Sequence, residues 1–175
     1  NVAASVYSGG LTLSGSEVQL ASGIYVVDGG TLKINAGTRV YNQLGGVSFF
    51  LMNGARLDVS GGADLDLSAY DIHDPNSRPD PFNGLLFFAD RTGTSVNHAI
   101  SGNSDSSMKG MIYFPNDGLT YTGSSSTTKP CIEVVAGTIT LSGTGSIQLG
   151  CEELQTQRPN SLPVISSYDR IRLVE

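Results

Sequence analysis

The chain has 175 residues, of which 39% are hydrophobic and 15% are charged, with 22 glycines and no tryptophan. This length suits one domain with a substantial core, spanning residues 1–175, and the composition is too apolar for a disordered chain. The net charge of -6 and the lack of a Lys/Arg cluster argue against nucleic acid or an anionic membrane surface as partner. No apolar run suits a transmembrane helix and no secretion signal is visible, so we expect a mature form or an excised domain, without membrane insertion by this fragment.

Two internal repeats organise the apolar residues. Residues 23–35 align without a gap over residues 48–60, and residues 111–123 align over residues 131–143. Such repetition is typical of a solenoid, in which each coil buries its apolar side against its neighbours. Because the repeated units are strands, the sequence predicts an all-β fold, a single-stranded right-handed parallel β-helix. The hand follows from the strong preference of parallel crossover connections.

About six short coils are expected between residues 9 and 151. In chain order they begin near Leu11, Ile24, Phe49, Leu86, Ile112 and Ile132. Each opens with a short apolar run, breaks at a Gly/Asn/Asp turn and continues as an alternating strand such as Leu32-Lys33-Ile34.

Two segments interrupt the repeat, and a tail follows it. Residues 68–84 are predicted to form an inserted loop that prolines make rigid. Residues 91–109 are irregular, and we place His98 there in a turn or on the surface. The tail, residues 152–175, would either cap the last coil or lie along its side.

The opening run of each coil is apolar at consecutive positions, which is typical of strands covered on both sides. Stacking at the repeat offsets predicts an outward column between two inward ones. The members of this interaction column are Tyr25, Phe50, Phe87 and Tyr113. Either the loop or the tail packs over the column, or the column is a contact surface for a partner or a second copy.

The two cysteines are predicted to stack. Met111, Cys131 and Cys151 follow one another at equal spacing, so they would occupy equivalent places on successive coils. Neighbouring parallel strands lie about 4.8 Å apart, within the range of a disulfide. We therefore expect a Cys131–Cys151 disulfide and an oxidising compartment. A pair of buried free thiols is the alternative.

Candidate ligand sites are few. The inserted loop gathers four side chains that suit Ca²⁺ or another metal, namely Asp71, His73, Asp74 and Asp80. Their spacing matches no known calcium loop, and solvated carboxylates are the simpler interpretation, so no cofactor is expected. Three further carboxylates, Asp58, Asp64 and Asp66, resemble the acidic face of carbohydrate-active β-helices.

Parts of the chain resemble the β-helical C-terminal ectodomains of TadG-like and PilX-like proteins of the tight adherence (Tad) and type IV pilus machineries. The resemblance is carried by SGIYVVDGGTLKINAG, GVSFFLMNGARLDVSGGADLDLSA, NGLLFFADR, MKGMIYFPNDGLTYTG and the closing RIRLVE. It covers most of the chain from Gly23 to Cys151. It implies an extracytoplasmic protein of the periplasm or cell surface, anchored by a segment not present in this chain, and it brings no catalytic residues.

The sequence therefore predicts a non-catalytic structural or adhesion domain of a bacterial pilus-associated envelope protein. Its partners would be other pilus or envelope proteins, further copies of itself, or a surface glycan. The alternative is a carbohydrate-binding or carbohydrate-active β-helix, a polysaccharide lyase or hydrolase, that uses the Asp-rich face.

Overall fold

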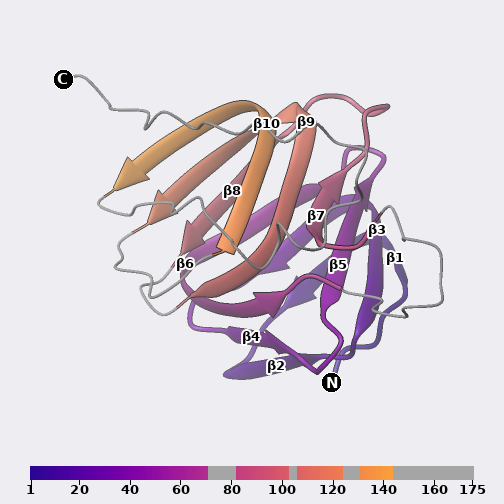
Figure 1. Ribbon diagram of the computed structural model, residues 1–175, viewed down its shortest axis with the longest axis vertical. Helices are drawn as coiled ribbons and strands as arrows, with labels where there is room; N and C mark the ends of the chain where they lie inside the picture. The colour runs from indigo at the N-terminus through magenta and orange to yellow at the C-terminus, as the bar shows by residue number, and fades with distance from the viewer. Residues whose placement is uncertain (71–81, 103–105, 124–130, 144–175) are drawn as a thin grey trace.

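The computed structural model describes residues 1–70, 82–102, 106–123 and 131–143. Within these ranges the chain forms ten strands and no helix (Figure 1). The strands are β1 (Val6–Leu13), β2 (Glu17–Leu20), β3 (Gly23–Ile34), β4 (Arg39–Asn42), β5 (Val47–Met52), β6 (Arg56–Ser68), β7 (Leu85–Ala89), β8 (Asn97–Gly102), β9 (Ser107–Gly123) and β10 (Cys131–Gly143). All pairings between these strands are parallel. The coils stack as a β-solenoid of about five turns, so the predicted parallel β-helix is confirmed.

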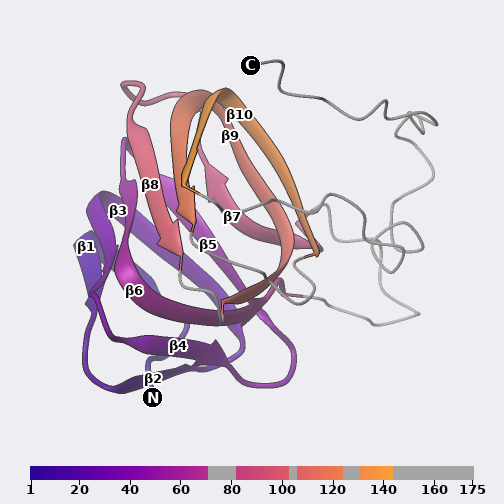
Figure 2. The same ribbon diagram turned by 90° about the vertical axis from the view of Figure 1, so that its left-hand side faces the viewer.

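The described strands lie on three faces, which Figure 2 shows from the side. Face A contains the first part of β1 and β3, then β5, β7, residues 111–114 of β9 and residues 131–136 of β10. Face B contains the second part of β1 and β3, then residues 56–59 of β6, β8, and the last parts of β9 and β10. Face C contains β2, β4, and parts of β6 and β9.

Glycines allow β1 and β3 to turn from face A to face B with little separation between coils. Gly30 has a φ of 68°, in the left-handed region that side chains rarely adopt. A Cβ atom on Gly30 would lie 2.1 Å from the carbonyl oxygen of Gly9 in the neighbouring coil. Only glycine therefore fits this corner without moving the coils apart.

The core consists of inward columns that run through the stack. On face A, Tyr25, Phe49 and Phe87 are fully buried, and successive ring centroids lie 5.0 and 5.3 Å apart. On face B, leucines at equivalent positions, among them Leu32 and Leu57, pair across neighbouring coils. Alternation within each strand puts the intervening side chains outside.

The first residues of the chain cover the N-terminal end of the stack. Val2 forms a parallel bridge to Leu20, which is fully buried. The hydroxyl group of Tyr25 lies within donating distance of two carbonyl oxygens, those of Val2 (2.7 Å) and Ala21 (2.8 Å). Burial raises the pKa of Tyr25 to about 12, so the phenol keeps its proton and its hydrogen bond well above neutral pH.

The pairing register differs from the ungapped alignment in the first half of each repeat. Tyr25 pairs with Phe49 on face A, one residue earlier than predicted, whereas Leu32 pairs with Leu57 on face B as predicted. The extra residue lies in the corner at residues 53–55, opposite the Gly29-Gly30 corner of the previous coil.

The second repeat shows the same kind of shift. Thr138 to Gly143 pair with Gly118 to Gly123 as predicted, but Met111 pairs with Glu133 and Cys131 pairs with Lys109. The predicted equivalence of Met111 and Cys131 is therefore wrong, because the corner that follows Phe114 contains two more residues than the corresponding corner of β10.

Candidate functional site

The shift in register changes the membership of the outward column on face A. Tyr25 and Phe87 are 0% exposed and belong to the core, so the prediction that they face outward is wrong. Phe50 and Tyr113 do face outward. The paired residues that share this outer surface include Val26, Phe50, Phe88, Tyr113 and Val135. We call these five residues the outer apolar column.

Aromatic contacts continue along the middle of the outer apolar column. The rings of Phe50 and Phe88 have centroids 5.2 Å apart, and Phe88 stacks on Tyr113 at 5.9 Å. Phe82, which precedes β7, packs edge-on against Phe50 at 5.2 Å and remains 43% exposed. Val135 at the end of the column is 38% exposed. The column is thus a continuous apolar strip that water partly reaches.

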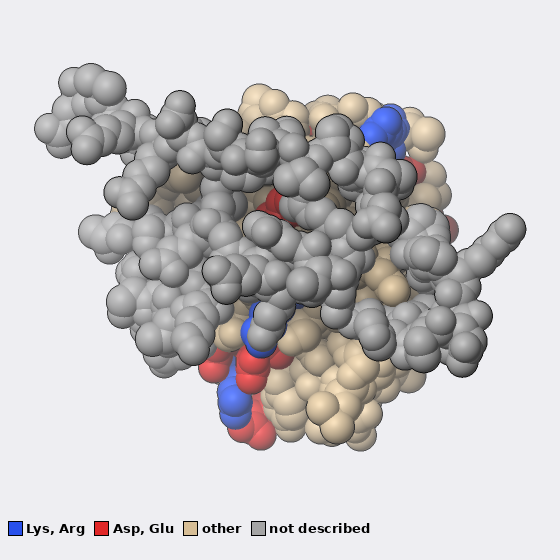
Figure 3. Space-filling view, viewed as in Figure 1, with Lys and Arg blue, Asp and Glu red and all other residues tan. Residues whose placement is uncertain are grey.

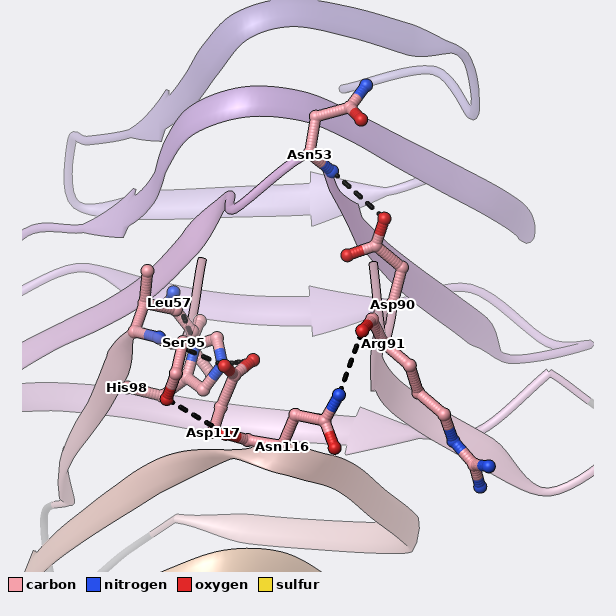
Figure 4. A network of polar contacts seen from close by, with 9 residues as sticks. Asn53, Leu57, Asp90, Arg91, Ser95, His98, Asn116 and Asp117 are labelled. Atoms are coloured by element: carbon pink, nitrogen blue, oxygen red, sulfur yellow. Dashed lines mark hydrogen bonds and ion pairs between the residues drawn. The ribbon is translucent and has the colours of Figure 1, made fainter. Parts of the chain in front are cut away.

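A cation borders the aromatic part of the column. The guanidinium group of Arg91 lies 5.5 Å from the ring centroid of Tyr113 and donates a hydrogen bond to its hydroxyl oxygen. Asn116 donates from its side-chain amide to the carbonyl oxygen of Arg91 at 2.8 Å (Figure 4). The backbone of Arg91 is therefore held by the neighbouring coil, while its charged group stays at the surface.

A second network lies at the corner between faces A and B. Asn53 donates its side-chain amide to Asp28 at 2.5 Å and its backbone N–H to Asp90 at 3.2 Å. The carboxylate of Asp90 also accepts a hydrogen bond from the hydroxyl of Thr92 at 2.9 Å. Three successive coils are joined by these contacts, which fix the corner that carries Arg91.

His98 lies in the core instead of in the predicted turn or on the surface. It is part of β8, is 0% exposed, and occupies the position between Leu57 and Leu119 in an inward column of face B. The backbone N–H of Leu57 points at Nδ1 of His98 at 3.0 Å. Because Nδ1 accepts this hydrogen bond, the proton of the neutral ring is on Nε2, which donates to Asp117 at 3.0 Å.

Asp117 completes this buried pair. Its second carboxylate oxygen accepts the backbone N–H of Val96 at 2.9 Å. Figure 4 shows Asp117 beside His98. Burial lowers the pKa of His98, although the hydrogen bond and the charge of Asp117 act in the opposite direction. Both ring nitrogens and both carboxylate oxygens thus have partners within the core. The pair connects β8 with β6 and with the corner of β9, and its atoms are out of reach of a substrate.

The three carboxylates of the predicted carbohydrate face lie on two different faces. Asp58 is on face B and forms an ion pair with Arg56 at 3.3 Å. Asp64 and Asp66 are on face C, where Arg39 lies between them and Glu17. The prediction of one acidic face is therefore wrong, because the chain turns from face B to face C between Asp58 and Asp64.

Charges of both signs lie close together on face C. Arg39 approaches Glu17 at 3.6 Å, Asp64 at 3.5 Å and Asp66 at 3.9 Å, and it lies over the ring of Tyr41. Figure 3 shows positive and negative groups intermixed over this part of the molecule, near β2 and β4. Exposed ion pairs of this kind contribute about 1 kcal/mol or less each.

Several predicted site residues lie outside the described ranges. These are the loop residues Asp71, His73, Asp74 and Asp80, together with Cys151. Cys131 begins β10. Among the residues that the structure does describe, no three His, Cys, Asp or Glu side chains gather closely enough to hold a metal ion. The same ranges contain no helix of the length and apolarity that a membrane crossing needs.

Comparison of the chain with protein-family models, curated proteins and solved structures finds no match.

The sequence contained a signal for the position of His98 that simple apolar matching overlooks. Asn97 to Ile100 pairs with Gly118 to Tyr121, so His98 corresponds to Leu119. Because histidine is polar, a histidine at a position that leucine occupies in neighbouring coils interrupts the apolar alternation by which a strand is recognised. Its partner Asp117 lies in a corner 19 residues further on, which no local pattern indicates.

Proposed function

We propose that the chain is a non-catalytic structural or adhesion domain of a bacterial pilus-associated envelope protein, which acts through protein contacts at the outer apolar column. The observation that carries this proposal is the continuous strip of Phe50, Phe88 and Tyr113 on the outside of face A. Aromatic side chains beside an arginine are the residue types that contribute most of the binding energy in protein interfaces.

The polar groups support a structural role over a catalytic one. The His98–Asp117 pair is buried, with its hydrogen-bonding atoms engaged by the backbone and by each other. The carboxylates considered for carbohydrate chemistry are divided between faces B and C and lie beside Arg56 and Arg39. A solenoid with internally satisfied polar groups suits a rigid support for a contact surface.

The cellular setting rests on the resemblance to TadG-like and PilX-like ectodomains. Such a resemblance implies the periplasm or the cell surface, where a Cys131–Cys151 disulfide would persist. A free-thiol count on protein purified without reductant tests this part of the proposal. No reactive thiol is expected, and two reactive thiols would contradict the disulfide.

The contact surface is tested by sedimentation of the purified chain, alone over a wide range of concentration and together with filaments sheared from a pilus-bearing bacterium. The test variant combines Phe50→Ser and Phe88→Ser. Leu44→Ser is the matched control, because Leu44 is an apolar side chain that is 98% exposed and lies outside the column.

We expect the wild type and Leu44→Ser to self-associate or to sediment with the filaments, and the double variant to do neither. Loss of a partly buried aromatic pair from an interface weakens binding by roughly 2 kcal/mol or more, about 30-fold. A wild-type chain that remains a free monomer in both experiments contradicts the proposal, and so does a double variant that binds as well as the wild type.

A further inference from the structure

The strand β8 joins its two neighbours unequally. On one side it pairs with β9 over its whole length without a shift in register. On the other side its register with β6 starts at Asp58–Ala99 and shifts between Val59 and Ala63. We call the contact between β6 and β8 the β6–β8 seam. It is the less regular of the two contacts, so local opening of the solenoid is expected to start there rather than between β8 and β9.

One hydrogen bond of the seam ends on a side chain instead of on the backbone. The backbone N–H of Leu57 donates to Nδ1 of His98 at 3.0 Å, one residue before the backbone pairing begins. Both residues are 0% exposed, so this hydrogen bond lies out of contact with solvent while the seam is closed. Because a protonated nitrogen accepts no hydrogen bond, the contact exists only while Nδ1 keeps its lone pair.

The groups around the ring decide which nitrogen can take up a proton. Nε2 already carries one, which it donates to Asp117 at 3.0 Å, and the ring of Phe114 stacks on the imidazole with centroids 3.9 Å apart. The charged groups that act on the ring are Asp117 in β9 and Arg56 in β6. Burial lowers the pKa of His98, the hydrogen bond and charge of Asp117 oppose this effect, and the charge of Arg56 adds to it. A proton from solvent can therefore bind only at Nδ1.

A proton at Nδ1 changes the two sides of the ring in opposite ways. Toward β6, the new N–H of the ring and the backbone N–H of Leu57 are both donors, so their hydrogen bond is lost inside the core. Toward β9, the positive ring strengthens its hydrogen bond to the carboxylate of Asp117, which also holds the backbone N–H of Val96. The cost of protonation therefore falls on the β6 side alone.

We propose that protonation of His98 opens the β6–β8 seam at Leu57 while β8 stays joined to β9, so that acid loosens the solenoid between these two coils before it unfolds as a whole. Opening returns the ring to water, where its pKa is about 6.5, so each pH unit below that value favours the open seam by up to about tenfold. At neutral pH the uncharged ring keeps the seam closed. This inference does not depend on the proposed function, since it concerns the interior of the solenoid.

Amide hydrogen exchange of the full chain, followed by NMR at about pH 7.5 and about pH 5 and expressed as protection factors, tests the proposal. The amide of Leu57 reports on the seam, and the amides of residues 119–122 report on the contact between β8 and β9. His98→Gln removes the titration but keeps an acceptor for Leu57. His73→Gln, which changes the other histidine of the chain, is the matched control. Nitrogen chemical shifts of the His98 ring show directly, in the wild type, which nitrogen carries the proton.

We expect the protection of Leu57 to fall at least about tenfold at the lower pH in the wild type and in His73→Gln, while residues 119–122 change less than about twofold. His98→Gln should keep Leu57 protected, and Nδ1 should be the unprotonated nitrogen at the higher pH. Constant protection of Leu57, or the same loss in His98→Gln, overturns the proposal. An equal loss at residues 119–122 also overturns it, because the solenoid would then open as a whole, and so does a proton on Nδ1 at the higher pH.

Discussion

At the scale of single residues, a buried histidine takes the place of a leucine. His98 fills a column of aliphatic side chains, and its two nitrogens bond to the backbone of one coil and to the carboxylate of another. The sequence alone predicts a turn or surface position for His98, because its polarity masks the alternation of β8. A buried polar group of this kind is compatible with the core only while all its hydrogen bonds are made.

The state of His98 predicts a dependence of stability on pH. Burial keeps the pKa of His98 below its ordinary value, so the His98 ring of the folded protein stays neutral at a pH where the same ring in the unfolded chain binds a proton. The unfolded state therefore takes up more protons as the pH falls below about 6.5, and the free energy of unfolding decreases. The loss should reach at most about 1.4 kcal/mol per pH unit.

Urea unfolding of the wild type and of His98→Gln between pH 7.5 and about 5 measures this contribution. Glutamine can keep one acceptor and one donor but does not titrate. We expect the difference in unfolding free energy between the two proteins to shrink as the pH falls. A difference that stays constant with pH would show that His98 does not contribute to acid sensitivity.

At the scale of elements, the existence of the strands was predictable but their register was not. The runs at residues 24–27 and 49–52 are apolar at inward and outward positions alike. An alignment shifted by one residue therefore still matches apolar residues with apolar residues, and the pattern does not determine the register. On face B the alternation in Leu32-Lys33-Ile34 is strict, and there the predicted register is confirmed. The shift in register is set by the number of residues in each corner, and that number produces no periodic pattern in the sequence.

The corner within β3, where the chain turns from face A to face B, offers a matched pair of glycines for a test. Gly29 and Gly30 have φ values of 72° and 68°, so alanine is strained at both. A Cβ atom on Gly29 would meet nothing within 4 Å, whereas one on Gly30 would strike the backbone of Gly9. We expect Gly29→Ala to lower the free energy of unfolding by about 1–2 kcal/mol.

Gly30→Ala should cost more than that, about 3 kcal/mol or above, because the backbones of two coils must also separate. Equilibrium urea unfolding of both variants measures the difference. Equal losses at the two positions would mean that the neighbouring coil does not restrict this corner.

At the scale of the whole molecule, repetition in the sequence was sufficient to predict the solenoid. It was insufficient to predict the surface, because the side on which each apolar residue lies depends on the register. Thus Phe50 and Tyr113 belong to the outer apolar column as predicted, while Tyr25 and Phe87 support it from within the core. The three carboxylates of the predicted acidic face lie on two faces for a similar reason, since the chain turns from face B to face C between Asp58 and Asp64.

The central claim is that the parallel register puts Phe87 in the core and Phe88 in the outer apolar column. The most direct test is the free energy of unfolding of Phe87→Ala and of Phe88→Ala, two adjacent residues of the same type in β7. We predict a loss of about 3–5 kcal/mol for Phe87→Ala and of less than about 2 kcal/mol for Phe88→Ala. Equal losses, or a larger loss at Phe88, would contradict the register and with it the proposed contact surface.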